Sequence, residues 1–206
     1  MIFLYYILII GIKNLINIIK NLIKYIIKYI IIMQIVINSN KNFTKALDKL
    51  LSSLENCKEF NDYNIIVCIG GYYELNNNYE ILKLKDNLMY IKVSHNSIDF
   101  TGLITVLENE KLFDNYFFYL HDTCVVGTNF LKILKEVSLE NITTYKIKLR
   151  SSMNIGIYSL PIIKKNSDFL LKQKNLDKSN EMTKKKSGVS LEDYIFKNDN
   201  NVKVLN

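Results

Sequence analysis

The sequence is short of several residues, and each shortage narrows the classes of protein to which it can belong. Among 206 residues there is a single proline, which argues against long disordered linkers, and a single arginine, Arg150. A protein that binds the DNA double helix is expected to present a basic face rich in arginine. We therefore expect no nucleic-acid partner.

Cysteine and histidine are also scarce. The chain has three cysteines and two histidines, and the cysteines (Cys57, Cys68 and Cys124) show no C-x-x-C spacing. The sequence therefore shows no Cys/His spacing that is typical of a zinc site. We expect three reduced thiols in a reducing compartment, where disulfides do not persist.

Three short nucleotide-binding or catalytic motifs are missing. No G-x-G-x-x-G follows the first predicted strand, and neither G-x-x-x-x-G-K-[ST] nor G-x-S-x-G occurs. These absences argue against a dinucleotide-binding Rossmann domain, a P-loop protein and a hydrolase with a nucleophile elbow. The net charge of +7 lies at the two ends, because residues 33–160 hold 13 basic against 14 acidic side chains.

The first 32 residues differ from the rest of the chain. Twelve apolar residues precede a stretch in which polar residues recur every three or four positions, with four lysines and no acid in the segment. A helix with such a stripe suits a membrane surface, whereas a span needs about twenty apolar residues. The positive charge follows the apolar run, whereas in a secretory signal it precedes the apolar core. If residues 1–12 inserted into a membrane, the lysines would hold the rest of the chain on the cytoplasmic side.

Two further interpretations of this segment stay open. In one, translation starts at Met33 and residues 1–32 are read-through; in the other, the segment is an interaction element of a membrane-surface protein. We expect residues 1–32 to form a separate hydrophobic and amphipathic segment and residues 33–206 to form one folded domain. The expected location is the cytoplasm, with a membrane surface as a further partner through residues 1–32.

From Met33 onward, strands and helices alternate. Short apolar runs predict strands, and runs with helical periodicity between them predict helices. The alternation predicts a single α/β domain with a mainly parallel sheet flanked by helices. We expect four strands to be adjacent, with their carboxyl ends sharing one crevice: 33–38, 64–69, 89–94 and 116–120.

The most informative stretch is the end of the fourth predicted strand. Residues 115–120 carry four aromatic side chains and run directly into His121, Asp122 and Thr123. In open α/β sheets, ligands bind outside the carboxyl ends of strands. The pair His121–Asp122 therefore predicts a ligand site; the alternative is a polar cap that only ends the strand.

This order of elements resembles the nucleotide-sugar-dependent glycosyltransferases of the GT-A fold, over roughly residues 33–195. In that family the fourth strand ends in an Asp-x-Asp motif, which holds a divalent metal on the donor diphosphate. Here Asp122 is the only carboxylate at that place, beside His121 and Thr123, so the sequence departs from the motif. The resemblance implies a manganese or magnesium site at Asp122, because hard cations prefer oxygen ligands and offset the charge of the leaving diphosphate.

The same resemblance implies contacts with the nucleotide. The family's first-strand loop lies against the base, and here that loop contains Asn38 and Ser39. The helix after the third strand also faces the nucleotide, which implies roles for Asp99 and Thr101. The alternatives are an ordinary polar turn for the first pair and a helix N-cap for Asp99.

Residues further along the chain correspond to the acceptor side of the family's site. The stretch of residues 151–160 resembles the acceptor-side strand, with Asn154 and Gly156 near the sugar. A later carboxylate at a helix start is the general base of inverting enzymes, which implies Glu192 or Asp193. The alternative is that these two acids only balance the helix dipole.

We therefore expect a glycosyltransferase-like protein that transfers a sugar from a nucleotide-sugar donor to an acceptor. Two alternatives stay open. One is a non-catalytic relative that keeps the fold, and the other is a membrane-surface interaction protein for which the α/β body is a scaffold.

Overall fold

The computed structural model describes residues 13, 15, 16, 19, 20, 33–147 and 151–205. The chain divides into two compact units, Met1–Ile32 and Met33–Asn206. The few described residues of the first unit are helical, and the predicted amphipathic stripe otherwise lies outside the described residues. Within the described ranges, no helix is long and apolar enough to cross a membrane.

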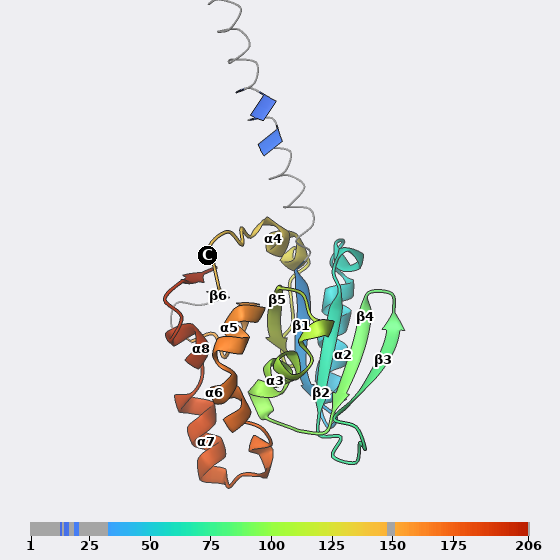
Figure 1. Ribbon diagram of the computed structural model, residues 1–206. Coiled ribbons are helices and arrows are strands. Elements are labelled where there is room, and N and C mark those ends of the chain that lie inside the picture. The colour runs from blue at the N-terminus through green and yellow to red at the C-terminus, as the bar shows by residue number, and fades with distance from the viewer. Residues whose placement is uncertain (1–12, 14, 17–18, 21–32, 148–150, 206) are drawn as a thin grey trace, which may run out of the picture. The chain divides into compact units, whose positions relative to one another are not determined.

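The second unit is a mixed α/β domain built on one eight-stranded sheet (Figure 1). The sheet order is β3-β4-β2-β1-β5-β7-β6-β8. The strands, in chain order, are β1 (Gln34–Asn40), β2 (Ile65–Gly70), β3 (Tyr79–Lys85), β4 (Leu88–Val93), β5 (Tyr116–His121), β6 (Thr144–Lys146), β7 (Gly156–Ser159) and β8 (Val202–Val204).

Helices and single turns of 3₁₀ helix connect the strands. The α-helices are α2 (Thr44–Glu55), α3 (Thr101–Glu108), α4 (Phe130–Glu136), α5 (Leu160–Lys165), α6 (Ser167–Lys172), α7 (Glu181–Ser190) and α8 (Tyr194–Lys197). The 3₁₀ turns are η1 (Phe60–Asp62), η2 (Ile98–Phe100), η3 (Glu110–Leu112) and η4 (Leu176–Lys178).

The four predicted strands are neighbours, as the sequence indicated. Strands β4, β2, β1 and β5 lie side by side, and each of the three pairs is parallel. The register aligns Asn38 of β1 with His121 of β5. This part of the fold prediction is confirmed.

The sheet as a whole is mixed, because antiparallel pairs flank the parallel centre and β8 pairs parallel with β6. Strand β3 runs antiparallel to β4, and β7 runs antiparallel to both β5 and β6. The β3–β4 hairpin was not predicted from the sequence. Strand β3 lies at the sheet's edge and is almost wholly exposed, so burial does not impose a clean alternation of apolar and polar residues on it.

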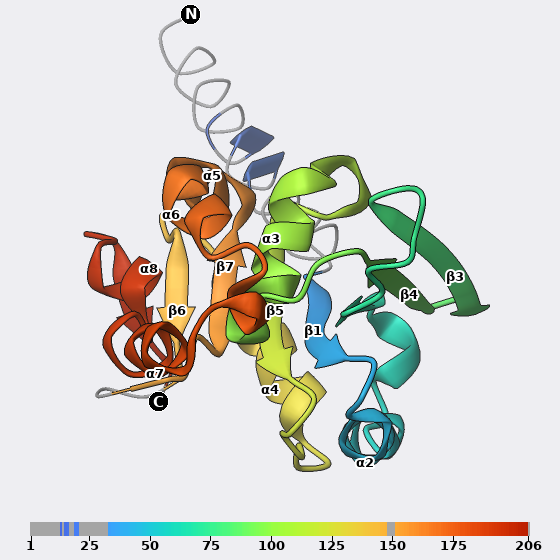
Figure 2. The same cartoon turned by 90° about the horizontal axis from the view of Figure 1, so that it is seen from below.

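Both faces of the central sheet are covered. Alternate residues of β1 point to opposite faces, so Ile35 and Ile37 pack with α2 and α4, whereas Val36 packs with α3, α5 and α6. Figure 2 shows these two layers of helices on opposite sides of the sheet. Burial on both faces explains why the central strands are almost continuously apolar.

Candidate functional site

The carboxyl ends of β1 and β5 meet at the point where the chain changes direction across the sheet. From β1 the chain proceeds outward through β2 to β4, and it then returns to place β5 on the opposite side of β1. Such a switch point opens a crevice between the two strand ends, which is where open α/β sheets bind ligands. The two strands deliver Asn38, Ser39, His121 and Asp122 to this place.

Asn38 ties the end of β1 to the start of α3. Its side-chain nitrogen donates to the carbonyl of Ile98 at 3.0 Å, and its side-chain oxygen accepts from the backbone N–H of Gly102 at 2.9 Å. Gly102 has no alternative here, since a Cβ would stand 2.7 Å from the Cε2 atom of Tyr119. The amide of Asn38 therefore fixes the loop that precedes α3.

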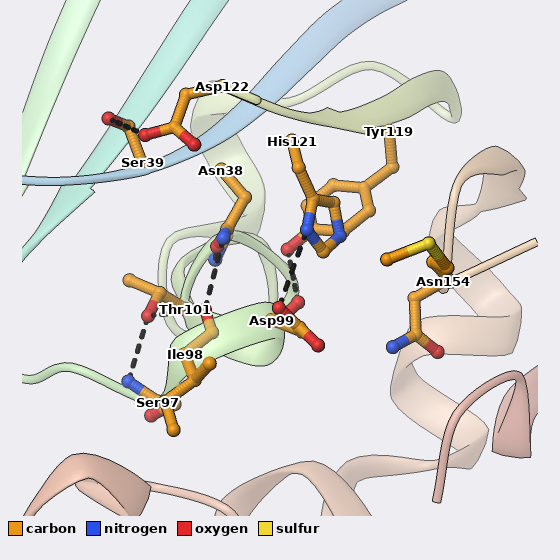
Figure 3. Close-up of polar contacts among 12 residues, drawn as sticks. Asn38, Ser39, Ser97, Ile98, Asp99, Thr101, Tyr119, His121, Asp122 and Asn154 are labelled. Carbon is orange, nitrogen blue, oxygen red and sulfur yellow. Dashed lines mark hydrogen bonds and ion pairs between the residues drawn. The ribbon is translucent and has the colours of Figure 1, made fainter. Parts of the chain in front are cut away.

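Thr101 has a similar internal role. Its hydroxyl accepts from the backbone N–H of Ser97 at 2.8 Å and donates to the carbonyl of Ile98 at 3.2 Å, and the residue is fully buried. The N-cap expected at Asp99 is wrong, because Phe100 occupies that position and no side chain caps α3. The carboxylate of Asp99 turns toward His121 instead (Figure 3).

The Asp122 carboxylate is held by hydrogen-bond donors of its own chain. Oδ2 accepts from the hydroxyl of Ser39 at 2.7 Å, and both residues are buried. Burial raises the pKa of Asp122, while the bond from Ser39, the nearby His121 and the backbone N–H groups of Asn40 and Thr123 act in the opposite direction.

This environment does not fit the metal that the resemblance implies. Within the described parts of the chain, no three His, Cys, Asp or Glu side chains converge to hold a cation. The hydroxyl and amide donors already occupy the Asp122 carboxylate, whereas a hard cation needs several oxygen ligands free to coordinate. The expected metal site at Asp122 is therefore not supported by the residues around it.

His121 is the side chain at this edge whose polar atoms are least satisfied. Its Nδ1 atom lies 3.4 Å from Oδ1 of Asp99, and its ring stands edge-on to that of Tyr119, with 5.6 Å between the centroids. The Nε2 atom is buried and has no hydrogen-bond partner among the residues that the structure describes. Figure 3 shows this nitrogen on the side of the ring that faces Asn154.

The charges around His121 oppose one another. Burial lowers its pKa, while the carboxylates of Asp99, Asp122 and Glu192 act to raise it, and the net direction is downward. The imidazole is therefore neutral at neutral pH, since even the ordinary histidine pKa is about 6.5. In the tautomer that carries its proton on Nδ1, this proton faces Asp99 and the lone pair of the neutral ring is on Nε2.

The carboxylate of Asp193 is bound by the backbone of its own chain. It accepts the backbone N–H groups of Ser152 at 2.6 Å and Asn154 at 2.9 Å. In return, the side-chain oxygen of Asn154 accepts the backbone N–H of Asp193 at 2.9 Å. Asp193 is 1% exposed and clamps this turn, and its expected catalytic role stays a prediction.

The remaining predicted site residues are Gly156, Glu192 and Thr123. A Cβ at Gly156 would stand 2.0 Å from the carbonyl oxygen of Tyr145, so glycine is required there by the close approach of β6. Glu192 is half-buried, and its carboxylate contributes to the field at His121. Thr123 is exposed just past the end of β5.

Four non-glycine residues in the left-handed region gather at this edge. The φ angles are 55° at Ile98, 52° at Met153, 61° at Asn154 and 59° at Asp193. Such conformations are costly for side chains with a Cβ, most of all for β-branched isoleucine, and they concentrate at functional sites. The sequence did not indicate these four conformations together, because isoleucine and methionine do not favour the left-handed region, whereas asparagine and aspartate do.

Comparison with known proteins leaves the function open. No model of a protein family matches the chain, and no curated protein does. Three solved structures align with 84% of it: an active-site mutant of LgtC (15% identity, 73% of that chain, TM-score 0.49), the galactosyltransferase LgtC with donor and acceptor sugar analogs (16%, 73%, 0.48) and S. aureus TarS (14%, 58%, 0.47). Similarities this distant do not indicate a function, and the function is therefore inferred from the residues of this chain.

Proposed function

We propose that this chain is a glycosyltransferase-like enzyme that binds a nucleotide-sugar donor at the carboxyl ends of β1, β4 and β5. One observation carries the proposal. The switch point between β1 and β5 brings together Asp99, His121 and Asp122 and surrounds them with strained loops. A protein keeps such costly backbone and an unsatisfied buried imidazole where a ligand or a reaction requires them.

Positive charge for the donor's diphosphate is available along the same edge. The ammonium groups of Lys41 and Lys92 lie 5.6 and 5.3 Å from the ring centroid of Tyr72. Lys41 directly follows β1, and Lys92 belongs to β4. Each lysine also lies 3.6 Å from a glutamate, Glu74 and Glu80 respectively. A diphosphate that displaced these surface glutamates would gain two cations beside an aromatic ring, which is the kind of charge stabilisation that a leaving diphosphate needs.

A second candidate is a relative that keeps the donor site and has no transferase activity. It is favoured by the Asp122 carboxylate, which its own chain occupies with hydrogen bonds. The proposed membrane partner rests on residues 1–32 and stays a prediction, because most of that segment lies outside the described residues.

Nucleotide binding is the first test. We would measure the melting temperature of the full chain with UDP, GDP, ADP and CDP and with their common sugar conjugates, with and without manganese. A ligand at 100 times its Kd stabilises the folded state by about 2.7 kcal/mol, which a thermal shift detects. If calorimetry finds no binding of any of these compounds, the proposed function is wrong.

A matched pair of lysine variants locates the binding. Lys41→Met removes an amine from the proposed diphosphate site, whereas Lys49→Met removes an exposed one from α2. We expect the first change to weaken nucleotide binding about tenfold, as for one charge-assisted contact, and the second to leave it unchanged. Equal effects would place the ligand elsewhere. Release of the nucleoside diphosphate from a bound sugar nucleotide then separates an enzyme from the non-catalytic candidate.

A further inference from the structure

Of the two carboxylates that the resemblance implied as general base, Asp193 is bound within the fold. It accepts the backbone N–H groups of Ser152 and Asn154 and is 1% exposed. Glu192 is half-buried, and its backbone carbonyl accepts from the ammonium group of Lys197 at 2.8 Å. The crevice holds a further side chain that can accept a proton.

A carboxylate–imidazole pair stands in the same crevice. Asp99 approaches Nδ1 of His121 at 3.4 Å, and the Nε2 atom on the far side of the ring is buried and without a partner. Tyr119 contributes to the geometry twice. Its ring packs edge-on against the imidazole, and its hydroxyl donates to the backbone carbonyl of Asp99 at 2.7 Å. Asp99 and His121 are therefore positioned by one tyrosine.

From this arrangement we propose that His121 is the general base of the transfer reaction and that Asp99 positions it, an inference that rests on the proposed function. Asp99 fixes the proton on Nδ1, which leaves the lone pair of Nε2 to take a proton from a hydroxyl group. The carboxylate also stabilises the imidazolium that forms, as an acid residue does in any carboxylate–histidine dyad.

The step balances in atoms and charge. The acceptor's hydroxyl oxygen forms a bond to the anomeric carbon of the donor sugar, and the bond from that carbon to the diphosphate oxygen breaks. The electron pair leaves with the nucleoside diphosphate, and the hydroxyl proton moves to Nε2 of His121, which later releases it to solvent. Attack from the face opposite the leaving group inverts the anomeric centre.

The approach to Nε2 lies on the side of Asn154 (Figure 3). The turn there spans Ser152 to Ile155, closed by a 2.8 Å hydrogen bond from the Ile155 N–H to the Ser152 carbonyl. Met153 and Asn154 at its centre are both left-handed, and Met153 is 56% exposed. Nε2 is buried in the free chain, so we propose that the acceptor reaches it by a shift of the chain on this side of the ring.

The chain contains its own control for the test. His95 is also buried, also has an unpartnered Nε2, and lies 3.8 Å from a carboxylate, that of Glu108. We would compare His121→Gln with His95→Gln in the full chain, using UDP-glucose, UDP-galactose, UDP-N-acetylglucosamine and GDP-mannose. The readouts are release of the nucleoside diphosphate into water, for which water acts as the acceptor, and calorimetric binding of the free nucleoside diphosphate.

We expect His121→Gln to slow release about 100-fold or more, with binding of the nucleoside diphosphate within threefold of the parent. His95→Gln should change neither. Imidazole added to a His121→Gly variant should restore part of the rate, which a purely structural role of His121 would not allow. Release that persists in His121→Gln, or imidazole without effect, would overturn the proposal.

A measurement without turnover separates this inference from the proposed function. Nitrogen NMR of the two imidazole rings at pH 7 should show His121 neutral with its proton on Nδ1, and Asp99→Asn should move the proton to Nε2. A parent protein that binds no nucleotide would defeat the proposed function and, with it, the reaction. A ring protonated on Nε2 in the parent would defeat the dyad even if nucleotides bind.

Discussion

The two histidines of this chain are alike in burial and opposite in setting. Each has an unpartnered Nε2 and a carboxylate nearby. At His95 that carboxylate, Glu108, also forms an ion pair with Lys174, and the lysine together with burial lowers the His95 pKa to about 4. Around His121, the charges that act on its pKa are the carboxylates of three residues, Asp99 among them, and no lysine.

The difference shows that a carboxylate beside an imidazole is not enough to make a dyad. Glu108 shares its charge with a lysine and meets His95 at 3.8 Å, while Nδ1 of His95 contacts the hydroxyl of Ser97 at 3.3 Å. His95 is therefore a packed neutral side chain. The Asp99 carboxylate is about one-third exposed, and its contact is with Nδ1, so it can set the tautomer of a ring that faces the crevice.

The largest expected effect comes from exchanging the two carboxylates for amides. Asp99→Asn should lower nucleoside diphosphate release about 100-fold, because an amide at this position can accept from Nδ1–H through its oxygen or donate to a bare Nδ1 through its NH2 group, and so loses control of the tautomer. Glu108→Gln should leave release within twofold. The rates are measured at pH 7 with a saturating sugar nucleotide.

Equal losses in the two amide variants would erase the distinction between the histidines. The stability of both variants is checked by urea denaturation, so that a slower rate is not confused with a smaller folded fraction. An unchanged rate in Asp99→Asn would remove Asp99 from any positioning role.

The second comparison is between the acid sensitivities of the two sites. The folded-state pKa of His95, about 4, lies below the unfolded value of about 6.5. Stability is therefore complete above pH 6.5 and is lost as the pH falls toward 4, because only the unfolded chain takes up the proton in that window. The loss at this one site amounts to about 3 kcal/mol.

Urea denaturation between pH 7 and pH 4 measures that loss. His95→Gln should flatten the profile, because glutamine does not titrate. His121 also has a lowered pKa, so His121→Gln should flatten the profile in the same direction. A His95→Gln profile as steep as that of the parent would contradict a buried neutral His95.

The third prediction concerns the turn around Asn154, which Asp193 binds and which lies on the Nε2 side of His121 (Figure 3). Asp193→Asn keeps a residue that tolerates the left-handed conformation but places an amide donor against the N–H of Ser152 or Asn154. We expect a loss of about 2–3 kcal/mol in the free energy of unfolding. Glu192→Gln, one residue earlier and half-buried, should cost less than about 0.5 kcal/mol. Chemical denaturation of both variants measures the difference, and similar losses would refute the clamp.

The sequence predicted the central sheet well because burial on both faces imposes continuous apolar strands. It also placed Asn38 and Asp122 at one crevice, since the ends of adjacent parallel strands meet there. The sequence could not show that both side chains would be occupied by the chain itself, at Gly102 and Ser39. Hydrogen-bond partners 64 and 83 residues apart leave no local pattern.

The clamp and the dyad were missed for related reasons. The sequence placed Asp193 at the start of a short helix, where an acid balances the helix dipole, whereas its carboxylate reaches back 39 and 41 residues. Asp99 has the spacing of an N-cap, but the 3₁₀ turn η2 before α3 rotates it toward β5. Local spacing predicts local hydrogen bonds, and in both cases a distant partner prevailed.

The smallest expected effect lies in the tyrosine that positions the dyad. The hydroxyl of Tyr119 donates to the carbonyl of Asp99 at 2.7 Å and accepts from the backbone N–H of Leu103. Tyr119→Phe removes both bonds and keeps the ring against His121, so we expect a loss of about 1–2 kcal/mol in the free energy of unfolding. Tyr63→Phe is the matched control, because Tyr63 is also buried and its hydroxyl donates to the carbonyl of Leu131 at 2.9 Å. Urea denaturation should show comparable losses for the two variants.

Nucleoside diphosphate release should fall severalfold only in Tyr119→Phe. Only in that variant does the backbone carbonyl that loses its hydrogen bond belong to the residue, Asp99, whose carboxylate orients His121. Equal rates in the two variants would mean that Asp99 holds its position without the tyrosine, and the dyad would then depend on the Asp99–His121 contact alone.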